Sequence, residues 1–130
     1  MKTIIALFTI LFLSLTFTAS DAVATLNDGE IARAVFASNV EDREPVDNLE
    51  SLEEGLERVY FFTDLRNFEG HTVTHRWYYN GEKDFEMNFD VGGPRWRTWS
   101  SKALTEHHTG TWRVDVIADE TVIDSFEISR

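Results

Sequence analysis

The sequence has no cysteine in its 130 residues. This absence excludes a disulfide framework, a thiol nucleophile and the lipid-modified cysteine that anchors bacterial lipoproteins. The sequence also lacks a Gly-rich phosphate loop, a nucleophile elbow and a serine placed three residues before a lysine. Carboxylates are plentiful, but no spacing selects a pair of them for acid–base chemistry. We therefore expect a protein that is not an enzyme, and a hydrolase remains a third hypothesis.

Basic residues are scarce. The chain has 12 Lys and Arg against 23 Asp and Glu, which gives a formal net charge of −11. A protein that binds nucleic acid needs a positive face for the phosphates, so this balance argues against a nucleic-acid partner.

Long apolar runs are confined to the N-terminus. Lys2 is followed by a run of fourteen residues, "IIALFTILFLSLTF", and then by the small pair Ala22 and Ala24. The run is shorter than the roughly 20 residues that a membrane span needs. The pattern predicts a signal peptide over residues 1–24 and one mature domain over residues 25–130. We expect export to the periplasm or the extracellular medium with no stable membrane anchor after cleavage; an uncleaved anchor is the alternative.

The rest of the chain alternates apolar and polar residues, which is typical of half-buried strands. Seven such segments are predicted at 31–40, 57–65, 71–79, 82–91, 95–101, 110–118 and 120–129. Asn80-Gly81 and Asp119-Glu120 are expected to be tight hairpin turns. One helical turn is expected within 48–57. The sequence predicts an all-β protein, an antiparallel, immunoglobulin-like β-sandwich of about seven strands, with a small β-barrel as the alternative.

Five blocks of the sequence resemble a known family. They are "RAVFASNVEDREPVDNL" (33–49), "RVYFFTDL" (58–65), "GHTVTHRWYYNG" (70–81), "VGGPRWRTWSSK" (91–102) and "TGTWRVDV" (109–116). In order and spacing they resemble the bacterial family called domain of unknown function 2914. The resemblance implies a small, exported or membrane-tethered β-domain of the cell envelope, and it implies no catalytic residues.

Aromatic and basic residues occur together on two predicted strands. On 71–79, Trp77 shares a face with Val73, while Arg76 and Tyr78 share the other face. We expect Trp77 to be a core residue packed against Phe61 and Trp112. Residues 95–101 carry further members of the set, and an exposed Trp beside Arg suits a sugar or a peptide. The candidate binding residues are Arg76, Tyr78, Arg95, Trp96, Arg97 and Trp99.

Charge is distributed unevenly along the chain. Residues 41–57 hold eight acids, whereas residues 91–105 hold Arg95, Arg97 and Lys102 and no acid. A basic stripe in an acidic protein suits an anionic ligand, because arginine binds carboxylates through a planar fork. The competing interpretation is that the acidic loop folds over the stripe and pairs with it. Arg43 is expected to tie this loop to the sheet, with a ligand contact as the alternative.

The sequence predicts no metal site and no cofactor. His71 and His75 would lie about 13 Å apart on a strand, too far to share an ion. We expect an exported, non-catalytic binding or interaction module whose partner is an anionic ligand, a cell-envelope glycan, a peptide or a protein. The alternative is a structural or assembly domain of the bacterial cell envelope that binds no small ligand.

Overall fold

The computed structural model describes residues 28–130, so the predicted signal peptide lies outside the described residues. Residues 28–130 form strands, turns and loops, with no helix among them. Within that range, accordingly, nothing has the length and hydrophobicity of a membrane-spanning helix. The strands are β1 (Glu30–Ala37), β2 (Val40–Glu41), β3 (Glu44–Pro45), β4 (Arg58–Arg66), β5 (Thr72–Tyr79), β6 (Glu82–Asp90), β7 (Arg95–Ala103), β8 (Thr111–Ala118) and β9 (Thr121–Ser129).

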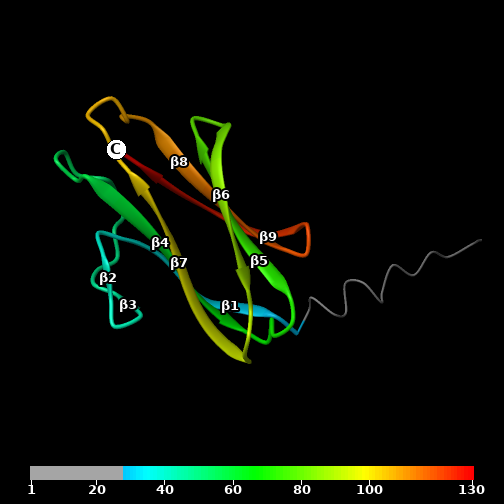
Figure 1. Cartoon of the computed structure of the whole chain (residues 1–130). Helices are drawn as coiled ribbons and strands as arrows, with labels where there is room; N and C mark the ends of the chain where they lie inside the picture. The colour runs from blue at the N-terminus through cyan, green and yellow to red at the C-terminus, as the bar shows by residue number, and fades with distance from the viewer. Residues whose placement is uncertain (1–27) are drawn as a thin grey trace, which may run out of the picture.

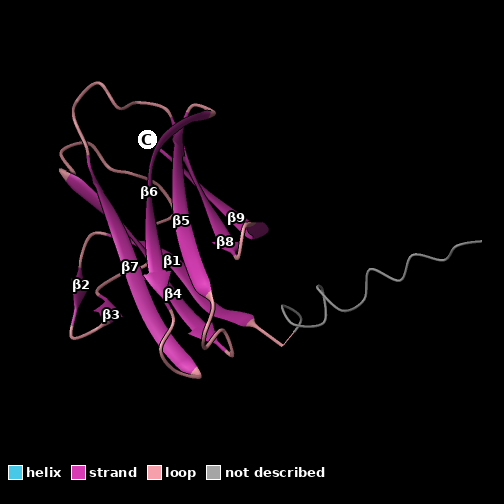
Figure 2. Cartoon of the chain, turned by 45° about the vertical axis from the view of Figure 1, so that its right-hand side comes forward, coloured by secondary structure: helices cyan, strands magenta, loops and turns pink. Residues whose placement is uncertain are grey.

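The seven long strands form two antiparallel sheets that face each other (Figures 1 and 2). The three-stranded sheet has the order β1-β4-β7, and the four-stranded sheet has the order β6-β5-β8-β9. Strands β2 and β3 pair only with each other and form a short hairpin beside the three-stranded sheet. The fold is an antiparallel β-sandwich. The barrel alternative is wrong, because the strands form separate sheets and not one closed sheet.

The predicted alternation of side chains accounts for the long strands. All seven coincide with predicted segments to within a few residues. The two predicted hairpin turns are also confirmed: φ is 48° at Asn80 and 85° at Gly81, and it is 46° at Asp119 and 72° at Glu120. Positive φ at both central residues is the signature of the two-residue turn that matches strand twist.

The segment between β1 and β4 differs from the prediction. The first predicted strand ends three residues early, at Ala37, and the chain turns into the β2–β3 hairpin. The helical turn predicted within 48–57 is wrong. The amide of Leu52 donates instead to the carbonyl of Ser129 at 2.9 Å, and Leu52 itself is buried in the core. Its side chain and amide thus fasten the loop to the end of β9, and this amide cannot also donate within a helical turn.

The core lies between the two sheets and is rich in aromatic rings. Trp77 is fully buried, and its ring centroid lies 6.4 Å from that of Phe61 and 6.0 Å from that of Trp112. The expectation that Trp77 is a core residue is confirmed. Both rings meet Trp77 edge to face, an arrangement that aromatic pairs favour.

A buried polar network joins the two sheets through this core. The Nε2 of His75, on β5, lies 3.0 Å from the Thr63 hydroxyl, and its Nδ1 lies 2.9 Å from the Ser100 hydroxyl. Ser100 also accepts a hydrogen bond from Trp77, and Thr63 bonds to Thr98. Burial lowers the pKa of His75 to about 3, so its ring is neutral at physiological pH.

Candidate functional site

An arginine cluster covers part of the outer face of the three-stranded sheet. Strand pairing places Arg33, Asp64 and Arg97 in one row across β1, β4 and β7. In the same way, Arg66 on β4 lies opposite Arg95 on β7. Because alternate residues of a strand point to the same face, all five side chains belong to the outer face of the sandwich.

Asp64 is the carboxylate at the centre of the cluster. Its side chain is only 1% exposed, and it lies within 3.5 Å of Arg33, 3.2 Å of Arg66 and 3.3 Å of Arg95. Burial of Asp64 raises its pKa, but the hydrogen bonds from Arg66 and Arg95 outweigh this effect, so the pKa lies below the ordinary aspartate value. Asp64 is therefore a fixed negative charge that holds three guanidinium groups in place.

Glu44, on strand β3, is the second carboxylate of the cluster. Arg33 donates to both of its oxygens, at 2.8 and 3.0 Å, and Arg97 donates to one of them at 2.5 Å. The hydrogen bonds from Arg33 and Arg97 lower the pKa of Glu44 to about 2. Glu44 thus fastens the β2–β3 hairpin to the outer face of the sheet.

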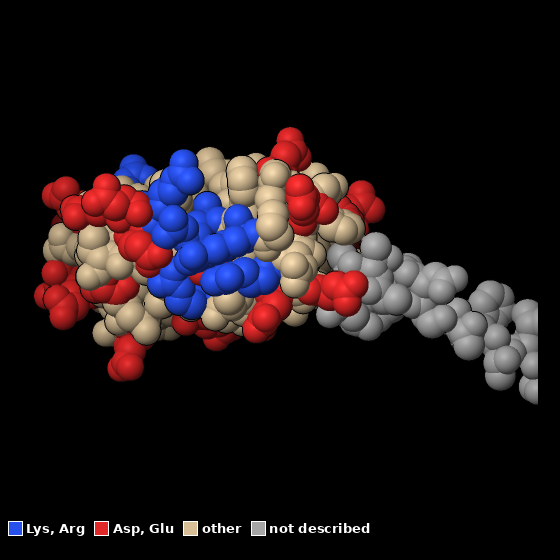
Figure 3. All heavy atoms as spheres, turned by 90° about the horizontal axis from the view of Figure 1, so that it is seen from below, with Lys and Arg blue, Asp and Glu red and all other residues tan. Residues whose placement is uncertain are grey.

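Cations outnumber anions in this cluster. Four guanidinium groups, those of Arg33, Arg66, Arg95 and Arg97, pair with the two carboxylates of Glu44 and Asp64. Arg43 at the hairpin tip adds a fifth cation nearby, so the cluster has an excess of three positive charges over these two carboxylates. Glu41 and Asp42 lie next to Arg43 in the chain. Figure 3 shows a continuous area of Lys and Arg side chains on the lower side of the molecule, with acidic side chains around it. A basic area of this kind is unusual in a chain with a net charge of −11.

A shallow pocket of about 310 Å³ lies at the edge of this cluster. It is lined by Arg43, Arg95, Trp96, Arg97 and Trp99. By alternation Trp96 belongs to the inner face of β7 and the other three β7 residues to the outer face. The pocket therefore lies over the free edge of β7, where side chains from both faces can reach it. We call it the edge pocket.

The structure divides the predicted site residues between two faces. Arg95, Trp96, Arg97 and Trp99 come together in the edge pocket. Arg76 and Tyr78 do not join them, because β5 belongs to the other sheet and presents these side chains on the opposite outer face. There Arg76 donates to Glu86 at 2.8 Å. The expectation of one binding face shared by strands 71–79 and 95–102 is therefore wrong.

Glu44, and not Arg43, connects the acidic loop to the three-stranded sheet. Arg43 is exposed and stands at the tip of the β2–β3 hairpin with φ of 61°. It forms no ion pair with another of the described residues 28–130. The tie between the acidic loop and the sheet is made by Glu44. The expectation that Arg43 makes this tie is wrong, and its side chain is instead open to the edge pocket.

The basic stripe is paired with acids, but only partly with the acidic loop. Of the acids in residues 41–57, Glu44 pairs with Arg97. Arg95 pairs with Asp64 from β4, and Lys102 pairs with Asp84 from the β5–β6 hairpin region at 2.6 Å. The expectation that the acidic loop pairs with the basic stripe holds for Arg97, whereas Arg95 and Lys102 pair with acids from outside that loop. The arginines are held by carboxylates from several elements, and they retain unused donors.

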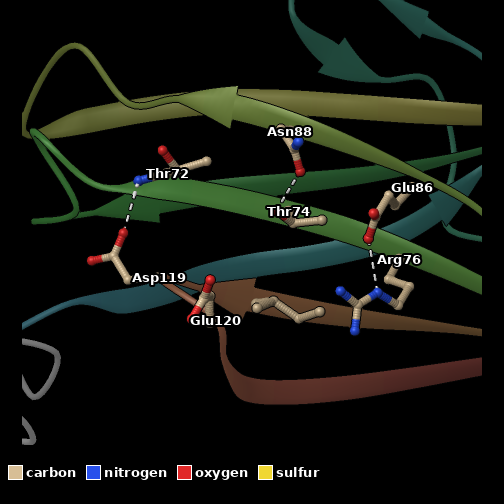
Figure 4. Close-up of a pocket in the computed structure, with 8 residues that line it drawn as sticks. Thr72, Thr74, Arg76, Glu86, Asn88, Asp119 and Glu120 are labelled. Carbon is tan, nitrogen blue, oxygen red and sulfur yellow. Dashed lines mark hydrogen bonds and ion pairs between the residues drawn. The ribbon is translucent and has the colours of Figure 1, made fainter.

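A second, larger hollow of about 580 Å³ lies on the outer face of the four-stranded sheet (Figure 4). Its polar lining is already bonded to itself: Thr74 donates to Asn88 at 2.6 Å, and Arg76 is held by Glu86. Ile117 is the one apolar residue in its lining. Two further acids, Asp119 and Glu120, close one end. It offers a ligand few unsatisfied groups, so the edge pocket is the stronger candidate.

His75 and Ser100 are hydrogen-bonded, as a nucleophile and its base would be, but both are sealed in the core. No substrate can reach them. No group of three or more His, Cys, Asp or Glu side chains within residues 28–130 is arranged to hold a metal ion.

The sequence patterns do not point to the residues that organise the cluster, which are Arg33, Glu44, Asp64 and Arg66. A signal was present for one of them: Asp64 interrupts the apolar run "VYFFTDL" of a buried strand. A lone acid in such a run is expected to have a charged partner. Its partners could not be chosen without the register that places Arg33, Arg66 and Arg95 around it.

Comparison with known proteins identifies a family and no function. The family model described as "Protein of unknown function (DUF2914)" matches residues 70–128, which include strands β5 to β8 and most of β9. The matched segment contains Arg95, Trp96, Arg97 and Trp99, but not Arg33, Arg43 or Asp64. A search of curated proteins gave no match.

Proposed function

Because the chain belongs to the DUF2914 family, whose description assigns no activity, we propose a function from the edge pocket itself. The protein is a non-catalytic binding module that takes an anionic ligand at the edge of β7. Arg43, Arg95 and Arg97 supply the positive charge, and Trp96 and Trp99 supply apolar walls.

The observation that carries this proposal is the number of guanidinium donors left unused. An arginine side chain has five N–H donors. Arg95 gives one to Asp64 and Arg97 gives one to Glu44, and Arg43 makes no ion pair with the other described residues. The carboxylates therefore fix the positions of Arg95 and Arg97 while most of their donors remain available. Donors held in place beforehand lose little conformational entropy when a ligand binds, which favours affinity.

The chemistry of the lining favours binding over catalysis. Arginine and tryptophan are the two residue types in the edge pocket, so it contains no general base and no nucleophile. The predicted signal peptide places the module in the periplasm or outside the cell, where acidic glycans, peptides and proteins of the envelope are the available anionic partners. This localisation follows from the sequence pattern alone.

A thermal-shift screen tests the proposal. Sulfate, acidic oligosaccharides, peptidoglycan fragments and acidic peptides are added to the purified protein. A ligand at a hundred times its Kd is expected to stabilise the fold by about 2.7 kcal/mol. The double variant Arg95→Ala/Arg97→Ala is expected to lose this effect. Arg76→Ala, on the opposite face, is the matched control and is expected to keep it.

Two results would count against the proposal. Equal stabilisation of the Arg95→Ala/Arg97→Ala variant would place the ligand elsewhere. If no compound stabilises the protein, the alternative of a structural or assembly domain of the cell envelope is favoured.

A further inference from the structure

We infer that the ligand of the edge pocket is a saccharide that carries a carboxylate. Its sugar ring lies on the exposed face of Trp96, and its carboxylate binds Arg95 and Arg97. This inference rests on the proposed function and specifies its ligand.

The indole of Trp96 is held as a platform. It is one of four large hydrophobic residues exposed among those described, at 37%. The Gly92-Gly93 pair supports it from one side: a Cβ added at Gly92 would lie 3.1 Å from the six-membered ring, and one added at Gly93 would lie 3.6 Å from it. The ring therefore lies close against backbone that carries no side chains, and its solvent-exposed part is turned outward. The indole therefore presents a flat apolar surface to solvent, beside the other tryptophan and the arginines that line the edge pocket.

The charges stand next to this platform. Arg95 and Arg97 precede and follow Trp96 in the chain, and all three line the same pocket. Trp99 forms a further aromatic wall and Arg43 a further cation. The C–H groups on one face of a pyranose ring carry slight positive charge and suit the negative face of an indole. A carboxylate on that ring would reach the guanidinium forks beside it, which bind carboxylates bidentately.

Other anions fit this lining less well. Inorganic sulfate or phosphate would use the arginines but leave both indoles bare, and such ions are typically held by backbone amides at helix ends or turns. An acidic peptide would pair with the free edge of β7 through its main chain. The edge pocket, however, presents large Trp96 and Arg side chains from both faces at that edge. A ligand that needs one flat apolar surface and one planar anion matches both residue types.

Calorimetric titration of the purified protein tests the inference with four probes. These are trigalacturonic acid, its neutral methyl ester, sodium sulfate and a hexaglutamate peptide. Trigalacturonic acid is expected to bind and its methyl ester is expected to bind at least about tenfold more weakly, because each charge-assisted contact is lost. Arg95→Gln is expected to weaken binding by about tenfold to a hundredfold.

Three variants isolate the contribution of the platform. Trp96→Ala and Trp96→Phe remove or shrink the ring, and Gly92→Ala displaces it while leaving every charge in place. We expect Trp96→Ala to weaken trigalacturonate binding roughly threefold to tenfold. Gly92→Ala should act in the same direction. Arg76→Ala is the control and should change nothing. If Trp96→Ala does not fold, as judged by circular dichroism, Trp96→Phe and Gly92→Ala provide the same test.

The outcomes separate the inference from the proposed function. If sulfate or hexaglutamate binds as tightly as trigalacturonate and the Trp96 and Gly92 variants bind normally, the saccharide is overturned while an anion site remains. If the methyl ester binds as tightly as the acid, carboxylate recognition is refuted. If no probe binds the wild-type protein, the inference and the anion site both fail.

Discussion

The buried ring of His75 makes the stability of this fold depend on pH in the range between about 6.5 and about 3. The ring is fully buried, and its hydrogen bonds go to the neutral hydroxyls of Thr63 and Ser100. Burial lowers its pKa from 6.5 to about 3. The unfolded chain therefore takes up a proton below pH 6.5 that the folded protein does not accept until near pH 3, so stability falls as the pH falls.

The magnitude follows from the two pKa values. From neutral pH to a pH well below 3 the total stability lost is about 5 kcal/mol, at 1.36 kcal/mol for each unit between the two pKa values. Between pH 6.5 and 5.0 a single such histidine accounts for about 1.6 kcal/mol. The depressed carboxylate pKa values act in a lower window: the stability contributed by Glu44 and Asp64 is present above their ordinary values of 4.5 and 3.8 and is lost below them. Measurements above pH 5 therefore isolate the histidine.

Urea unfolding at pH 6.5, 6.0, 5.5 and 5.0, followed by tryptophan fluorescence, measures the effect. We expect the free energy of unfolding to fall by about 1.6 kcal/mol across this range in the wild type. His107→Gln should show the same fall, because His107 is 88% exposed. His75→Gln is expected to be less stable at every pH and to lose the dependence. A flat wild-type profile would show that His75 is reached by water or that the network is not formed.

Three further predictions concern the cluster and the turns. Asp64→Asn removes the charge that holds Arg33, Arg66 and Arg95, and we expect it to cost about 1–3 kcal/mol in urea unfolding at pH 7; a loss below about 0.5 kcal/mol would contradict its central role. Gly81→Ala places a side chain at φ of 85° with no atom within 4 Å, so its cost is conformational only, about 1–2 kcal/mol by thermal unfolding; no change in Tm would argue against the turn geometry. Glu44→Gln removes the carboxylate that holds Arg33 and Arg97 in place, and we expect several-fold weaker binding of trigalacturonate by calorimetry; tighter binding would mean that Glu44 competes with the ligand for these arginines.

The strands were predictable because burial on one face imposes a period of two over eight or nine residues. Strands β2 and β3 have two residues each, too few for any period to show. The helical turn within 48–57 was a reasonable expectation from composition, but a long-range bond from Leu52 to Ser129 decided the local structure. The sequence contains no local trace of that bond.

The candidate site was predictable in part for a similar reason. Arg95, Trp96, Arg97 and Trp99 are close in sequence and remain close in space. Arg76 and Tyr78 would lie beside these four residues only if β5 and β7 belonged to the same sheet. They do not, because the chain crosses from the four-stranded to the three-stranded sheet between β6 and β7. The Asp64 contacts require the β1-β4-β7 register, which links residues more than thirty positions apart.

The net charge of the protein changes what the edge pocket can select. An anion that approaches a chain of charge −11 is repelled at distances within the Debye length of about 8 Å from most of its surface. Attraction is confined to the arginine cluster, where positive charge is in local excess. The proposed ligand would therefore not be gathered by a long-range field, and its association is expected to be slower than for a basic protein. Affinity has to come from short-range geometry, from planar forks and a supported indole. A site of this kind discriminates among anions by their shape, since charge alone gives them little advantage.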